Sequence, residues 1–293
     1  SLVDNVKFSA GGFQARYGDK LSSVLDITYR QPDSFAASVE ASFLGANVHV
    51  EDKSKNNRFS YLVGARFRSN QYLLGSLDVQ GDYKPRFFDI QTLLKYRITT
   101  DISLSYLTTL SQNRYLVTPQ SRQTSFGNVN SALSLFVAFG GQELMEYTTW
   151  MNGLNLEYKP EGKRIELKLN ASSYITSERE HFTIEGAYRL SELENNLGSD
   201  DFANEKALLG VGYFMDHARN DLQARVFAIN QKGKFALEKS SIQWGFGFTK
   251  ENIVDKLKEW RYNDSSGYNI STRNKDNAGN EIILDEFLKA DIN

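Results

Sequence analysis

Apolar and polar residues alternate along most of the chain with a period of two. In 35–43, Phe35, Val39 and Phe43 share one face with two alanines, while serine and glutamate residues occupy the other. Successive side chains of a β-strand point to opposite faces, so such a run predicts a strand with one apolar and one polar wall. The same alternation predicts further strands in 59–68, 88–98, 102–110, 150–158, 165–170, 222–228 and 242–249. In 222–228 the pattern assigns Val226 to the apolar wall and Arg225 to the polar wall.

The connections between these strands alternate in length. Short polar turns are expected at 53–57, 99–101, 161–163 and 239–241, and longer loops at 69–84, 112–149 and 178–220. Outer-membrane barrels sort their connections in this way, with short periplasmic turns and long extracellular loops. A soluble β-sandwich or a lipocalin-like barrel also explains the alternation, with the apolar walls as its core. Neither gives a reason for sorting the loops by length.

Composition narrows the choice further. The 293 residues carry a formal net charge of -2, which gives no electrostatic case for nucleic-acid binding. With 19 Phe and 15 Tyr against 4 Pro, the chain is rich in residues that favour strands. Aromatic residues also gather at strand ends, as in the belts at membrane interfaces. Examples are Phe35, Phe59, Phe87, Phe88, Tyr158 and Trp244.

The sequence offers little for catalysis. Cysteine is absent, which excludes disulfides, thiolate metal sites and cysteine nucleophiles. His49, His181 and His217 have no metal-binding spacing, and neither a nucleophile elbow nor a phosphate-binding loop occurs. We therefore predict no enzyme activity, no cofactor and no metal site.

The run from Gly11 to Tyr29, GGFQARYGDKLSSVLDITY, resembles the end of the plug in TonB-dependent outer-membrane receptors, in the branch common in Bacteroidetes-type bacteria. Arg16 lies within this motif. The matching residues are Gly11, Gly12, Phe13, Ala15, Tyr17, Gly18, Leu21, Ser22, Ser23, Val24, Leu25, Asp26 and Ile27. Weaker matches to barrel strands and outer loops of that family follow in 42–53, 59–74, 85–99 and 184–202.

The resemblance implies an all-β fold: an antiparallel transmembrane β-barrel of 22 strands preceded by a plug. Residues 1–32 would be the C-terminal end of the plug and 33–293 about the first nine barrel strands. An open set of strands is not tolerated in lipid, so we expect the chain to belong to a longer polypeptide. The implied location is the outer membrane, crossed several times.

The resemblance also implies a function, which is uptake of a scarce nutrient by ligand binding and plug gating without covalent chemistry. The implied partners are outer-membrane lipid, an unknown small ligand and a TonB-type energising protein that binds a segment absent from this sequence. The alternative is a barrel subunit that acts as a scaffold in a surface-lipoprotein, secretion or assembly complex. In that case 133–139, LSLFVAF, is a candidate protein-binding face.

Gating requires contacts that hold the plug against the barrel wall. A buried charge needs a partner, and Glu40 and Glu157 are acidic residues on polar strand faces. The hypothesis is that Arg16 of the plug motif pairs with Glu40 or with Glu157 as a plug–barrel latch.

Overall fold

The computed structural model describes residues 2–11, 22–71, 81–128, 130–265, 271–275, 281–283 and 286–292. Every secondary-structure element that lies wholly within these residues is a β-strand, and every strand pair is antiparallel, which confirms the all-β prediction. Within these residues, no helix has the length and apolar character needed to cross a membrane.

The strands form three sheets. A small hairpin at the N-terminus consists of β1 (Val3–Ser9) and β2 (Val24–Tyr29), and another consists of β14 (Ser271–Lys275) and β15 (Glu281–Ile283). The large sheet contains β3 (Ala36–Ser42), β4 (Gly45–Lys53), β5 (Phe59–Ser69), β6 (Gly81–Tyr83), β7 (Arg86–Arg97), β8 (Ile102–Pro119), β9 (Arg122–Asn128), β10 (Ser131–Tyr158), β11 (Ile165–Leu193), β12 (Glu205–Ala236), β13 (Ser241–Ser265) and β16 (Glu286–Ile292).

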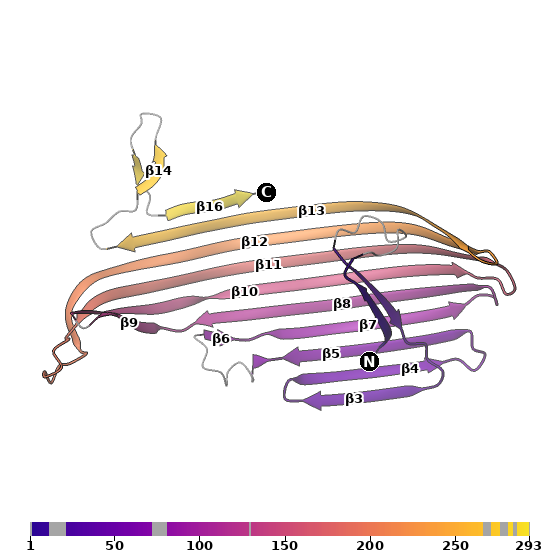
Figure 1. The fold of residues 1–293 in the computed structure, drawn as a ribbon, viewed down its shortest axis with the longest axis horizontal. Helices are drawn as coiled ribbons and strands as arrows, with labels where there is room; N and C mark the ends of the chain where they lie inside the picture. The colour runs from indigo at the N-terminus through magenta and orange to yellow at the C-terminus, as the bar shows by residue number, and fades with distance from the viewer. Residues whose placement is uncertain are drawn as a thin grey trace.

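The large sheet follows the order of the chain. Its strands run β16-β13-β12-β11-β10-β8-β7-β5-β4-β3, with β6 paired to β8 and β9 paired to β10. Figure 1 shows them side by side in one curved sheet. Among the described strands, β3 and β16 form the two ends of this order and do not pair with each other, so the sheet is open. The antiparallel wall is confirmed, and its closure into a barrel stays a prediction.

Unlike the two-residue turn 43–44 between β3 and β4, which lies at the opposite end, the four predicted short turns all lie at one end of the sheet, on the right in Figure 1. They occupy 54–58, 98–101, 159–164 and 237–240, close to the predicted positions. We call this the short-turn end and the opposite one the distal end. Gly45, which opens β4 after the β3–β4 turn, has φ +143, and a side chain there would clash with the Phe67 carbonyl oxygen. The turn therefore requires glycine at this position.

Two of the predicted long loops are wrong, because both regions are strand. β10 pairs with β11 without interruption from Leu133↔Glu192 to Tyr158↔Leu167, and β11 pairs with β12 through most of 178–220. Only 194–204 connects β11 to β12. At about 3.3 Å per residue, the 29 residues of β11 extend roughly 95 Å. We call 131–148 of β10, 177–193 of β11 and 205–224 of β12 the distal extension.

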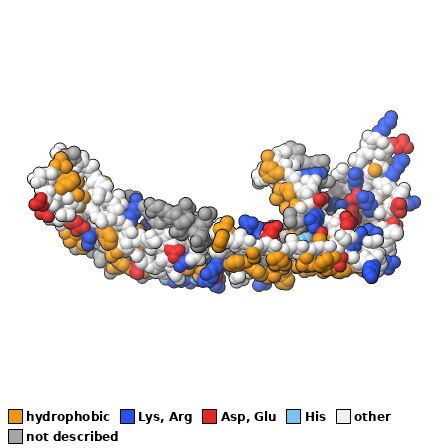
Figure 2. Space-filling view, turned by 90° about the horizontal axis from the view of Figure 1, so that it is seen from below, with side chains coloured by type: hydrophobic (Ala, Val, Ile, Leu, Met, Phe, Trp, Pro, Cys, Tyr) orange, Lys and Arg blue, Asp and Glu red, His pale blue; other side chains and the backbone are white. Residues whose placement is uncertain are grey.

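The N-terminal hairpin lies across one face of the large sheet (Figure 1). This face is called the hairpin face and the other the apolar face. Hydrophobic side chains line the apolar face on the lower side of Figure 2. The face assignment for 222–228 is wrong: Ile229 pairs with Ala171, which pairs with Leu154, so Phe227 and Ile229 lie on the apolar face and Val226 on the hairpin face.

Candidate functional site

An ion pair joins the hairpin to the large sheet. Arg30, directly after β2, places its guanidinium against the carboxylate of Glu51 in β4. Only 8% of the Glu51 side chain is exposed, against 40% of that of Arg30. His49 Nε2 lies 3.0 Å from the other carboxylate oxygen of Glu51. The buried carboxylate is thus held from both sides, as a buried charge requires.

Packing and backbone contacts surround this ion pair. The Arg30 backbone N–H donates to the Leu2 carbonyl at 3.1 Å, which closes the base of the hairpin. A Cβ added at Gly64 would lie 2.9 Å from Leu2 Cδ1, so the absence of a side chain in β5 makes room for the hairpin. Beside Gly64 on the same face, the directly paired Leu62 and Leu93 are buried.

The charges of this ion pair help to hold the hairpin against the sheet. The hydrogen bond to Glu51 raises the pKa of the Arg30 guanidinium above its usual value, so the hairpin side stays charged at every working pH. Moving Arg30 away while Glu51 is still buried would leave this carboxylate without its strongest partner. The contact can therefore hold the hairpin and resist its removal.

The predicted latch involved other residues. Arg16 lies outside the described residues, so its pairing stays a prediction. Its two proposed acceptors already have neighbours within the sheet, because Glu40 accepts a hydrogen bond from Asn47 Nδ2 at 2.8 Å and Glu157 lies 3.3 Å from Lys168 Nζ.

Of the plug motif, only the two flanks are described. Gly11 follows β1, and Ser22 and Ser23 precede β2. Outside the described residues lie Gly12, Phe13, Ala15, Arg16, Tyr17, Gly18 and Leu21. Sequence reasoning missed Arg30, Glu51 and His49. The only signal was an arginine at the end of an expected plug strand, without an acceptor that spacing could identify.

Near the short-turn end, exposed hydrophobic side chains of the apolar face form a band that has the same width along several strands. It runs from Phe59 to Phe67 in β5, and the two ends are 38% and 46% exposed. Two other strands repeat the arrangement of an exposed aromatic at each end of nine residues, with Phe88 and Tyr96 in β7 and Trp150 and Tyr158 in β10. Such a continuous exposed apolar surface is unusual for a protein surrounded by water.

The band is slanted relative to the rows of paired residues. One such row passes through Phe59, Tyr96, Leu104, Leu156, Leu169, Gln231 and Phe246. In β5 the band ends at Phe67, eight residues distal to the row, but in β13 it ends at Phe248, two residues distal to it. The band thus descends by about one residue per strand, which corresponds to strands tilted by roughly 35° for the usual strand spacing and rise.

A ladder of charges lies on the same face just beyond the band. Arg114 Nε is 3.3 Å from Glu146, Arg179 Nη1 is 3.3 Å from Glu146, and Arg179 Nε is 3.4 Å from Asp221. The four residues pair directly across β8, β10, β11 and β12, four positions distal to Trp150 in β10. The change from exposed aromatics to exposed ion pairs marks a sharp boundary on one continuous surface.

Comparison with known proteins gives no match: no protein-family model, no curated protein and no solved structure is similar to the chain. In the part of the chain that the structure describes, no three His, Asp or Glu side chains are grouped as a metal site would require. The docked hairpin and the slanted band are the features of the described residues that bear on function.

Proposed function

We propose that this chain forms the end of the plug and the first strands of the barrel of an outer-membrane TonB-dependent receptor that takes up a scarce nutrient. The observation that carries the proposal is the slanted apolar band, bounded by exposed aromatics such as Phe59, Phe67, Trp150 and Tyr158. Nine strand residues tilted by roughly 35° span about 24 Å, close to the lipid-facing band of outer-membrane barrels.

The tilt supports a barrel rather than a flat sheet. Closing a sheet into a barrel requires strands inclined by about 35–45° to its axis, and the band on β5 to β13 has this inclination. Outer-membrane lipid would cover the band, and the charge ladder with Glu146 and Arg179 would lie in the headgroup region or beyond it. The open edges at β3 and β16 would be closed by further strands of a longer polypeptide.

The hairpin face supports the gating part of the proposal. In a barrel this face lines the lumen, and the hairpin held by Arg30 and Glu51 blocks part of it. A TonB-type protein would pull on the plug and break this contact, so the work is binding and gating without covalent chemistry. The nutrient would bind from the distal side, where the long strands rise above the band.

Cell fractionation with gel mobility tests the proposal directly. The intact protein should be found in the outer-membrane fraction, have a mass two to three times 33.3 kDa, and migrate faster before heating than after, as folded barrels do in detergent. A soluble protein of 33.3 kDa without a heat-dependent shift would overturn the proposal.

A crosslink tests the gate. The chain contains no cysteine, so Leu2→Cys with Gly64→Cys gives one reactive pair between hairpin and sheet. Bridging the pair with a short bifunctional thiol reagent should abolish energised uptake, and cleaving the reagent should restore it. Two cysteines within the sheet, Ser105→Cys and Asn155→Cys, provide the matched control, because crosslinking paired strands does not restrain the hairpin. Equal uptake before and after the hairpin crosslink would contradict gating.

A second candidate function is that of a scaffold subunit in a surface complex. It is favoured by exposed apolar side chains at the distal end, where Leu197 is 78% exposed and Leu208, Leu209 and Phe202 are also exposed. The predicted face at 133–139 is part of β10, paired with β9 and β11, rather than a free loop. Purification with a stoichiometric partner that Leu208→Ser and Leu209→Ser release would favour this function, and saturable small-ligand binding would favour the receptor.

A further inference from the structure

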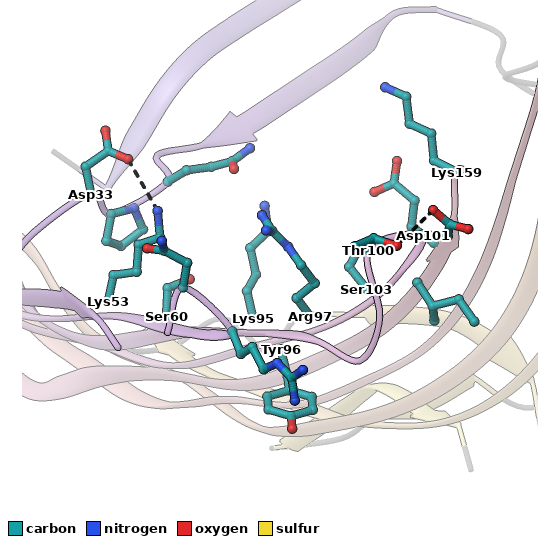
Figure 3. A pocket seen from close by; sticks show the side chains of 16 residues that line it. Asp33, Lys53, Ser60, Lys95, Tyr96, Arg97, Thr100, Asp101, Ser103 and Lys159 are labelled. Atoms are coloured by element: carbon teal, nitrogen blue, oxygen red, sulfur yellow. Dashed lines mark hydrogen bonds and ion pairs between the residues drawn. The ribbon is translucent and has the colours of Figure 1, made fainter. Parts of the chain in front are cut away.

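A cavity of about 430 Å³ lies on the hairpin face at the short-turn end. It is bounded by the linker 31–33 after the hairpin, the turn around Thr100, and the ends of β7, β8 and β10. Figure 3 shows the side chains around it. The volume suits a small molecule, and the cavity is separate from the Arg30–Glu51 contact because neither residue lines it.

The charges around this cavity are not balanced. Its lining contains the cations Lys53, Arg58, Lys95, Arg97 and Lys159 and the carboxylates of Asp33, Asp101 and Glu157. Each carboxylate has a partner: Asp33 lies 3.9 Å from Lys53, Glu157 lies 3.3 Å from Lys168, and Asp101 accepts from the Thr100 hydroxyl at 3.2 Å.

Besides Arg58, three further cations of the lining, which project from β7 and the end of β10, are without an ion pair among the described residues. Among the described residues, no carboxylate lies within ion-pair distance of Lys95, Arg97 or Lys159. Lys95 is half-buried near Glu157, whose carboxylate already lies 3.3 Å from Lys168 Nζ, and a half-buried ammonium without an ion pair of its own is costly. Lys95 and Arg97 project side by side into the cavity from alternate positions of β7, while Tyr96 between them points to the apolar face (Figure 3).

The cations approach the cavity from more than one side. Lys159 lies across it from Lys53, with Lys95 and Arg97 between them (Figure 3). Ser60 and Ser103 add hydroxyl donors to the lining. Guanidinium and ammonium groups form their strongest hydrogen bonds with carboxylates and phosphates. Cations on opposite sides suit a ligand with more than one anionic group.

We propose that this cavity is a binding site for a small polyanion, a molecule with two or more carboxylate or phosphate groups. Lys95 and Arg97 bind one anionic group and Lys159 binds another. Because the linker 31–33 forms one wall, the bound molecule also joins the base of the hairpin to the sheet.

Calorimetric titration of the full-length protein in detergent tests the site, with citrate and pyrophosphate as separate probes and sucrose as the uncharged control. One of the two anions should bind with saturation at one site per chain, and the tighter one identifies carboxylate or phosphate as the preferred group. Lys95→Gln with Arg97→Gln should weaken binding at least tenfold. Lys159→Gln alone should weaken it several-fold, which keeps the test valid if the double variant does not fold.

The matched control removes two charges at the same end of the sheet but outside the cavity. Arg164→Gln with Lys239→Gln changes exposed residues of two short turns and should leave the dissociation constant unchanged. The proposal is overturned if neither anion binds with saturation, or if the control variant weakens binding as much as Lys95→Gln with Arg97→Gln. Neither outcome depends on membrane location or uptake, so failure here is distinct from failure of the receptor proposal.

Discussion

The strands β10, β11 and β12 present different surfaces at the level of the apolar band and in the distal extension. In the band, one face exposes Trp150, Leu154 and Leu156 while the hairpin face is polar. A few residues further along β10, the same face carries Glu146 in the charge ladder. Backbone pairing continues unchanged across this boundary.

This difference distinguishes what the backbone and what the side chains contribute to these strands. The hydrogen-bond ladder between strands can continue across the boundary, because it uses main-chain groups that polar and apolar residues share. The side chains only determine which environment each level of the sheet can face. The boundary between Trp150 and Glu146 therefore marks a change in the environment that this face of the sheet can contact. It does not mark the end of a strand. Under the receptor proposal, that change is from lipid to water.

A charge in the middle of the band gives the largest expected effect. Leu154→Arg should destabilise the folded protein in lipid by about 2–4 kcal/mol, because a lipid-facing arginine is costly near the membrane centre. The free energy of unfolding from lipid vesicles measures the effect.

The extension provides the control for this substitution. Gln142→Arg adds the same charge to an exposed position of β10 beyond the ladder and should change stability by less than about 0.5 kcal/mol. Equal effects of Leu154→Arg and Gln142→Arg would show that the band does not face lipid.

Removing the ion pair between the hairpin and the large sheet should give the next largest effect. This contact lies on the hairpin face, opposite the apolar band. Arg30→Ala leaves the buried Glu51 with His49 as its remaining close partner and should weaken hairpin docking by roughly 2 kcal/mol, less than for a fully buried pair because Arg30 is partly exposed. Hydrogen exchange of β1 and β2 measures the opening. Arg66→Ala, which removes a 2.7 Å ion pair with Asp89 inside the sheet, should not expose the hairpin.

Much of the fold was predictable from the sequence. The alternation in 59–68 and 88–98 indicated strands, and the predicted short polar turns appear close to where they were expected. The long strands of the extension were not predictable, because the alternation fades beyond Trp150 and polar strands read as loops. In β12 both faces carry apolar residues, so the pattern could not decide between Val226 and Phe227. The register with β11 decides it.

The residues of the candidate site were harder to predict from the sequence than the strands were. A lumen-facing latch was expected on general grounds, but Glu51 is 21 positions from Arg30 and nothing in their spacing pairs them. The pairing depends on how the hairpin crosses β4 and β5, which Gly64 and Leu2 help to set. The cavity beside Lys95 likewise depends on the linker 31–33 folding over the end of β7.

Breaking the charge ladder of the distal extension should destabilise the protein less than the two changes above. Arg179→Gln removes contacts to both Glu146 and Asp221, and all three side chains are partly exposed. Exposed pairs contribute little, so we expect a loss of about 0.5–1 kcal/mol at low salt. Hydrogen exchange of β11 in 50 mM and 1 M sodium chloride measures it. Because salt screens exposed charges, the difference should disappear at high salt, and a salt-independent loss would mean that packing is involved.

The smallest effect concerns pH within the extension. Burial, and next the charge of Glu180, raise the pKa of Glu143. A raised carboxyl pKa means that the folded state binds the proton more tightly than the unfolded state, so ionised Glu143 costs stability above its folded pKa and the cost disappears as pH falls below the unfolded value. Glu143→Gln should therefore slow hydrogen exchange of β10 slightly at pH 7.5, after correction for intrinsic rates, and not at pH 4. Glu146→Gln, which loses its contacts to Arg114 and Arg179, should have the opposite effect at pH 7.5. Faster exchange in Glu143→Gln at pH 7.5 would show that this carboxylate stabilises the extension, as the ladder does on the other face.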